Sequence, residues 1–145
     1  MDSNVLIAVA AEAHEHHGAS LDLVISCAGE DFAVAAHSYA ETYSTLTRGG
    51  SRGPFGFAPA EAWAALESLR ARTALIGLTP SQSFATVRAF ATSRGIGARL
   101  YDKLIGEVAV IHGIPAIVTW NLGHMRALFP DLVVESPEAF RRSVR

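Results

Sequence analysis

The sequence of 145 residues lacks several features that define whole classes of protein. A single cysteine, Cys27, excludes an internal disulfide and a metal site built from the chain's own thiolates. No apolar run approaches the roughly 18 residues needed to span a bilayer, and the amino terminus has neither the basic region nor the cleavage site of a signal peptide. These absences predict a soluble, cytoplasmic protein with no membrane partner.

The sequence also has little excess charge of either sign. Its 12 basic and 14 acidic residues give a formal net charge of −2, which provides no general attraction to nucleic acid and even a weak repulsion. A polyanionic substrate would therefore need local basic residues or metal ions. Because 50% of the residues are hydrophobic, the chain is long and apolar enough to bury a core, and extensive disorder is excluded.

Helix and strand patterns alternate along the chain with short connections. Strands are predicted at residues 31–36, 73–79, 114–120 and 132–136. Helices are predicted at 4–20, continued by 19–30, and then at 37–48, 59–71, 80–93, 98–112 and 122–128. In the helix at 59–71, Trp63, Leu66 and Leu69 are expected to face inward. The order predicts one α/β domain over 1–145, with a mostly parallel sheet covered by helices on both faces.

Three acids and one amide lie where an open parallel sheet gathers reactive groups, beyond the carboxyl ends of its strands. They are Asp2, Glu41, Asp102 and Asn121. Each acid also has a purely structural explanation. Asp2 can cap the first helix, and Glu41 can close a capping box with Ser38. Asp102 lies in the first half of its helix, where the macrodipole favours an acid.

The helix at 98–112 carries two stripes at helical spacing. The expected core stripe consists of Leu100, Leu104, Val108 and Ile111. The second stripe surrounds the acid with small residues, namely Ala98, Asp102, Gly106 and Ala109. Small neighbours would let the helix approach the sheet closely and would leave the carboxylate partly desolvated, where it must find a cation or a donor.

In this order, the segments resemble the PIN-domain family and, within it, the VapC toxins of bacterial VapBC toxin–antitoxin modules. The matching segments are "MDSNVLIAV", "AAHSYAETYSTLTR", "GARLYDKLIGEVAVIHGI", "IVTWNLGHMRAL" and "VVESPEAF", which cover nearly the whole chain. The resemblance implies a three-layer α/β/α sandwich. Only Met1 precedes Asp2, so the first strand of that sandwich is expected to be truncated, or translation to begin upstream.

The same resemblance implies a Mg²⁺- or Mn²⁺-dependent endoribonuclease that hydrolyses RNA phosphodiesters. Its metal-activated water would be held by Asp2, Glu41 and Asp102. Many members carry aspartate where this chain has Asn121, so the site is less negative and a second metal is less certain. Polar positions that orient the family's site match Ser3 or Asn4 and Thr119. The resemblance also implies an RNA substrate, a cognate VapB-like antitoxin and a homodimer.

Two other classes of function fit parts of the sequence. A non-catalytic RNA- or protein-binding module that keeps the fold is motivated by Asn121 and by the truncated start. A phosphoacceptor receiver domain also places acids on a parallel sheet, but this chain lacks the acidic pair expected near the first strand. The receiver interpretation therefore ranks below the other two.

Two further patterns invite a ligand. His14, His16 and His17 are close in sequence, but their spacing gives no single helical face and no second cluster completes a zinc site, so an exposed polar face is expected. The segment "GGSRGPFGF" at 49–57 lacks the phosphate-loop pattern and is predicted to be a surface loop. Two arginines and two aromatic residues lie in or beside this loop, namely Arg48, Arg52, Phe55 and Phe57. They can contact RNA or antitoxin, or they can pack as in an ordinary loop.

Overall fold

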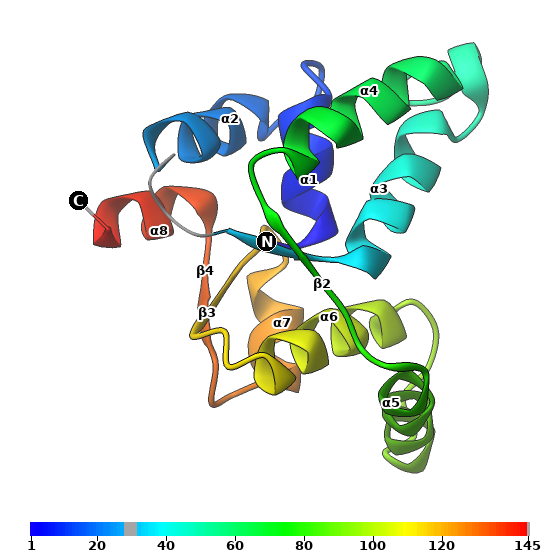
Figure 1. The fold of residues 1–145 in the computed structure, drawn as a ribbon, viewed down its shortest axis with the longest axis vertical. Coiled ribbons are helices and arrows are strands. Elements are labelled where there is room, and N and C mark those ends of the chain that lie inside the picture. Colours follow the sequence, from blue (N-terminus) through cyan, green and yellow to red (C-terminus); the bar gives the residue numbers. More distant parts are fainter. Residues whose placement is uncertain (28–31, 145) are drawn as a thin grey trace.

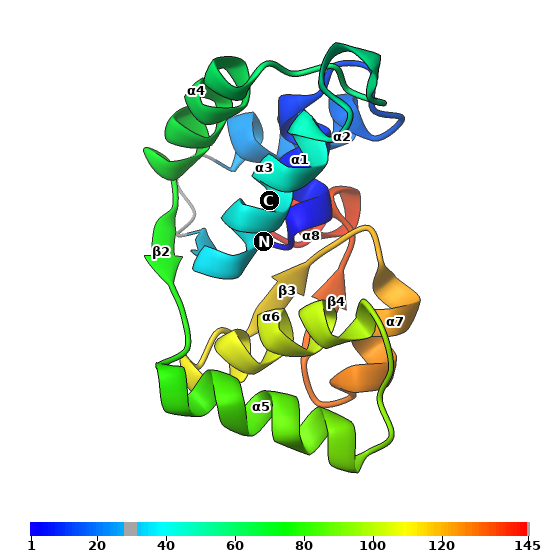
Figure 2. The same cartoon turned by 90° about the vertical axis from the view of Figure 1, so that its right-hand side faces the viewer.

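The computed structural model describes residues 1–27 and 32–144, and in it the helices lie on both sides of short parallel strands (Figure 1). The first half of the chain forms α1 (Ser3–Ala10), α2 (His17–Ser26), β1 (Ala33–Ala35), α3 (Ala36–Thr47), the 3₁₀ turn η1 (Gly50–Arg52) and α4 (Pro59–Arg70). The second half forms β2 (Ala74–Ile76), α5 (Pro80–Thr92), α6 (Arg99–Ile111), β3 (Ala116–Val118), α7 (Leu122–Leu128), β4 (Val133–Glu135) and α8 (Pro137–Ser143). Figure 2 shows α1–α4 on one side of the strands and α5–α7 on the other, which is the predicted α/β/α arrangement.

The four predicted strands are present, but they form two separate parallel pairs. β1 pairs with β2 with Val34 opposite Leu75, and β3 pairs with β4 with Ile117 opposite Val134. The expected single sheet is therefore wrong in detail. Each strand is only three residues long, and the helix α1 begins directly at Ser3.

The first two residues lie between the two sheets and donate one hydrogen bond to each. The amino group of Met1 donates to the carbonyl of Ala33 in β1 at 2.7 Å. The backbone amide of Asp2 donates to the carbonyl of Val118 in β3 at 3.0 Å. Residues 1–2 thus take the place of a central strand and bring Asp2 to the carboxyl end of β3.

The predicted helix at 4–20 is interrupted, which corrects the first helical assignment. Helix α1 ends at Ala10, Ala11 adopts an extended conformation, and turns at 11–17 lead into α2. The backbone amide of His16 donates to Nδ1 of His14 instead of to a helical carbonyl, so a side chain competes with the helix for a backbone donor. The predicted continuation over 28–30 lies outside the described residues.

Helix packing confirms part of the predicted core and reverses another part. Leu66 and Leu69 are buried as expected, and Cys27 is a buried apolar residue, but the side chain of Trp63 is 58% exposed. On α6 the predicted core stripe is only partly correct, because Val108 is buried while Ile111 lies at the surface, and Ile105, Gly106 and Ala109 complete the buried face. No helix within the described ranges is both long and apolar enough to cross a bilayer.

Candidate active site

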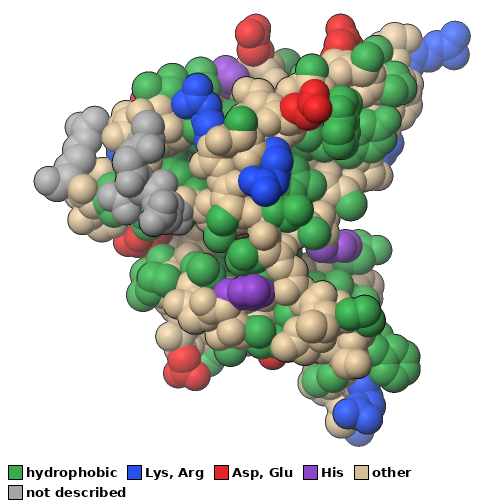
Figure 3. All heavy atoms as spheres, viewed as in Figure 1, with side chains coloured by type: hydrophobic (Ala, Val, Ile, Leu, Met, Phe, Trp, Pro, Cys, Tyr) green, Lys and Arg blue, Asp and Glu red, His purple; other side chains and the backbone are tan. Residues whose placement is uncertain are grey.

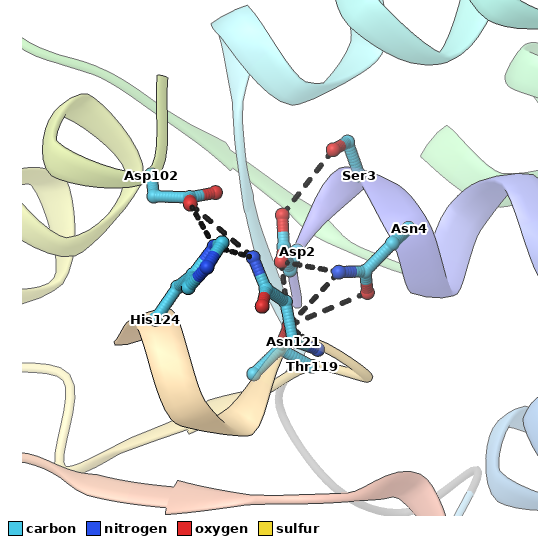
Figure 4. A network of polar contacts seen from close by, with 7 residues as sticks. All are labelled: Asp2, Ser3, Asn4, Asp102, Thr119, Asn121 and His124. Atoms are coloured by element: carbon cyan, nitrogen blue, oxygen red, sulfur yellow. Dashed lines mark hydrogen bonds and ion pairs between the residues drawn. The ribbon is translucent and has the colours of Figure 1, made fainter. Parts of the chain in front are cut away.

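Asp2 is fixed at the start of α1 by its neighbours in sequence and by β3. It occupies the N-cap position of α1, yet its carboxylate makes no capping hydrogen bond to the helix backbone. Instead, its Oδ1 accepts from Ser3 Oγ at 3.2 Å and its Oδ2 accepts from Asn4 Nδ2 at 2.8 Å and Thr119 Oγ1 at 2.6 Å (Figure 4). The helix-cap explanation of this side chain is therefore wrong. With an exposed fraction of only 1%, the carboxylate depends on these three donors.

Thr119 and Asn4 link the start of the chain to the end of β3. The hydroxyl of Thr119, which is fully buried, also accepts from the backbone amide of Asn121 at 2.9 Å. The side-chain oxygen of Asn4 accepts from the backbone amide of Trp120 at 3.1 Å. The two polar residues expected to orient the site therefore hold both Asp2 and the backbone that carries Asn121.

Asp102 enters the site from the first turn of α6, whose small residues allow close packing. A Cβ added at Gly106 would lie 2.0 Å from the ring of Phe129, which directly follows α7. The close approach predicted for this stripe is thus present, although its partner is Phe129 rather than the sheet. Because α6 and α7 pack closely at this point, Asp102 lies against the residues at the start of α7.

Asn121 and His124 lie next to Asp102 (Figure 4). The amide nitrogen of Asn121 is 3.3 Å from Oδ2 of Asp102 and 3.1 Å from Nδ1 of His124. The same imidazole nitrogen is 3.8 Å from Oδ2 of Asp102. Sequence reasoning missed His124. The signal was its position three residues after Asn121 in a predicted helix, a spacing that puts both side chains on one face.

Glu41 reaches the site from the second turn of α3, which packs against α6. The capping-box explanation of Glu41 is wrong, since α3 begins at Ala36 and Ser38 already lies inside the helix. The hydroxyl of Ser38 is buried without a hydrogen-bond partner in the described part of the chain. Glu41 therefore has no capping role that would account for its position near Asp102.

The electrostatics of Asp102 place Asp2 and Glu41 close enough for their charges to act on its carboxyl. Burial, together with the charges of Asp2 and Glu41, raises the pKa of the Asp102 carboxyl to about 6, against the opposing effects of His124 and Arg99. A carboxyl in this setting is partly protonated near neutral pH unless a cation compensates. The structure thus brings together all four residues that the sequence singled out: Asp2, Glu41, Asp102 and Asn121.

The donor set fits a hard divalent cation. Carboxylate and amide oxygens are the ligands that Mg²⁺ and Mn²⁺ prefer, and Mg²⁺ commonly keeps several waters while using a few carboxylates. Within residues 1–27 and 32–144, no three His, Cys, Asp or Glu side chains come together as a set of direct metal ligands. Few direct protein ligands, completed by water and substrate oxygens, are what this arrangement can offer to a cation.

The two other candidate ligand patterns are used in packing. The ring of His16 stacks on Trp120 with centroids 4.0 Å apart, and Nδ1 of His17 hydrogen-bonds the carbonyl of Ala8 at 2.9 Å. In the loop, Phe55 and Phe57 pack against a buried cluster between α1, α3 and α4, whereas the adjacent arginines are exposed. These contacts favour the ordinary packing role for the loop.

Comparison with known proteins agrees with this geometry. A search of curated proteins finds no match to the chain. The family model described as the PIN domain matches residues 1–126, a range that contains all the side chains of the site and stops before β4 and α8. An ordered acid set, an α/β/α arrangement and this match lead to one conclusion: the chain belongs to the PIN-domain family, a family of metal-dependent nucleases.

Proposed function

We propose that this protein is a metal-dependent endoribonuclease and the toxin of a toxin–antitoxin pair. The nuclease class follows from the family, whose members typically use divalent metal ions. The preference for RNA and the toxin role rest on the resemblance to VapC toxins. The single observation that carries the proposal is the meeting of Asp2, at the N-cap of α1, with Glu41 of α3 and Asp102 of α6. Burial and the charges of the other two acids raise the pKa of the Asp102 carboxyl.

In the proposed reaction, Asp2, Glu41 and Asp102 would hold Mg²⁺ or Mn²⁺ through carboxylate oxygens, in part by way of bound waters. A bound divalent ion supplies an activated water and stabilises charge on the phosphodiester oxygens. Asp2 remains in one orientation because Ser3, Asn4 and Thr119 donate to it. Asn121 contributes a neutral amide beside Asp102, so the total negative charge around the ion is lower than with a fourth acid.

The experiment is cleavage of a structured RNA panel with Mg²⁺, with Mn²⁺ and with EDTA. Asp2→Asn, Glu41→Gln and Asp102→Asn should each remove cleavage, because each deletes one charge next to the ion. Asp131→Asn is the matched control, since it makes the same chemical change at an exposed residue between α7 and β4. Undiminished cleavage by the Asp102→Asn protein would reject the assignment.

A toxin of this kind would have a protein partner and a defined cellular location. We expect a VapB-like antitoxin encoded beside this chain, a homodimer, and action in the cytoplasm. Co-expression with the product of the adjacent reading frame should relieve growth arrest and yield a stable complex on gel filtration. Growth arrest that is unchanged by every neighbouring product would contradict the toxin role without affecting the nuclease assay.

One observation favours a second function, a non-catalytic binding module. The Asn121 amide donates toward Asp102, where a fourth acid would instead add a metal ligand. Titration calorimetry with Mn²⁺ separates the two functions. A degenerate site should take up no ion at millimolar concentration, whereas the nuclease should bind an ion and lose it in the Asp102→Asn variant.

A further inference from the structure

A cleft of about 600 Å³ opens between the start of α3, the end of β2 and the helices α5 and α6. Figure 3 shows the surface hollowed at this place, at the right-hand side of the view. The volume falls in the range of sites that take small organic ligands. Among the described residues the lining is largely apolar and includes no carboxylate; its main members are His37, Ser83, Phe84, Val87, Leu104 and Val108.

One lining residue carries a polar atom without a partner. Nε2 of His37 is buried and has no hydrogen-bond partner in the described part of the chain. Buried ring nitrogens are normally satisfied, so an unpaired one calls for an explanation such as a missing ligand. The ring itself is held by Tyr101, on which it stacks with centroids 4.9 Å apart and an interplanar angle of 29°.

A second lining residue presents an aromatic surface. Phe84, on α5, is 74% exposed. A single exposed aromatic residue needs no explanation by itself. Here, however, it borders the same cleft as His37, whose Nε2 has no partner among the described residues, so the cleft combines a ring for stacking with a residue able to form a hydrogen bond.

The cleft lies near the acids, because residues at the cleft are close in sequence to Glu41 on α3 and to Asp102 on α6. His37 and Glu41 are four residues apart on α3 and share a face of that helix. Tyr101, which supports the His37 ring, directly precedes Asp102 on α6. A polymer whose phosphate lies at the acids therefore has the cleft within reach of a neighbouring nucleotide.

We propose that this cleft receives one unpaired base of the RNA strand that is cut at the acids, and that it sets base preference. The inference rests on the proposed nuclease function. Proteins recognise single-stranded RNA by stacking splayed bases on aromatic rings and by hydrogen bonding to the base edges. Phe84 supplies the stacking surface, His37 supplies the hydrogen bond, and the described lining residues carry no carboxylate that would repel the strand.

The test measures binding without cleavage. In the Asp102→Asn background with EDTA, fluorescence anisotropy follows binding of fluorescein-labelled RNA octamers of A, C or U, and of a ribose-phosphate octamer without bases. Phe84→Ala should weaken binding of at least one base-containing octamer about tenfold, the loss expected for one stacked base, and leave the abasic octamer unchanged. His37→Phe keeps an aromatic ring against Tyr101 but removes Nε2, so it should reduce the differences among the three base-containing octamers.

Trp63→Ala is the matched control, because it removes another exposed aromatic side chain, on α4 and away from the cleft. Equal affinities for the Phe84→Ala and Trp63→Ala proteins would overturn the proposal. So would conversion of a dimer to monomers by Phe84→Ala in sedimentation velocity with RNA affinity unchanged, which would assign the cleft to a contact between copies.

The cleavage assay keeps this inference distinct from the nuclease proposal. If the wild-type protein cleaves RNA in a metal-dependent way but Phe84→Ala leaves RNA affinity unchanged, only the base site is rejected. Base-dependent binding that requires Phe84, without cleavage by the wild-type protein, supports the base site and rejects the nuclease.

Discussion

Asp102 is the acidic side chain whose ionisation the fold changes most clearly. Burial and the charges of Asp2 and Glu41 raise its pKa from 3.8 to about 6. The native protein therefore binds more protons at this position than the unfolded chain does between about pH 4 and pH 6. As the pH rises through that window, the carboxyl loses its favourable neutral form and the free energy of unfolding decreases.

Replacing Asp102 by Asn should abolish this pH-dependent decrease in the free energy of unfolding of the metal-free protein. A two-unit shift corresponds to about 3 kcal/mol in full, and solvent screening of a partly exposed group reduces our expectation to about 1 to 2 kcal/mol. In urea unfolding with EDTA, Asp102→Asn should match the wild type near pH 4 and exceed it by that amount above pH 6. The exposed control Asp131→Asn should show no growing difference with pH. A constant difference for Asp102→Asn at every pH would contradict the raised pKa.

At the scale of elements, close packing of α6 against α7 positions Asp102. We expect Gly106→Ala to lower the free energy of unfolding by about 1 to 3 kcal/mol, because the added methyl overlaps the buried Phe129 ring. Gly18→Ala in α2 is the matched control. Nothing lies within 4 Å of a Cβ there, so the better helix propensity of alanine should stabilise the protein by up to about 1 kcal/mol. Chemical denaturation of both variants measures the contrast, and equal effects would exclude a tight α6–α7 contact.

Sequence patterns predicted the elements better than their packing. Pro80 after the cap residue Thr79, with Gln82 closing the box, placed the start of α5 correctly, because caps are local interactions. Trp63 and the true inner face of α6 depend on which neighbours each helix meets, and periodicity alone does not contain that information. The positions of Asp2, Glu41 and Asp102 in the chain could be predicted, whereas the contact of His124 with Asp102 required the α6–α7 geometry.

At the scale of the whole molecule, ion binding should increase the free energy of unfolding. A ligand present at 100 times its Kd adds about 2.7 kcal/mol to the free energy of unfolding. For a chain of this length we expect Mn²⁺ at that ratio to raise Tm by roughly 5 to 10 °C at pH 7.5. The rise should shrink at pH 5, where Asp102 is protonated, and should be absent from the Asp102→Asn protein in calorimetric scans. An identical rise in that variant would place the ion elsewhere.

Residues 1–2 are hydrogen-bonded to both β1 and β3, so an ion bound to Asp2 would also restrain the two sheets. Asp2 lies between the two sheets, while Asp102 belongs to the helices on the far side of them. An ion shared by the two carboxylates would close a loop of about 100 residues, and clips that close long loops restrict the unfolded chain most. Such an ion would then act as a reversible cross-link, and the layers of the protein would separate less often when it is loaded for catalysis.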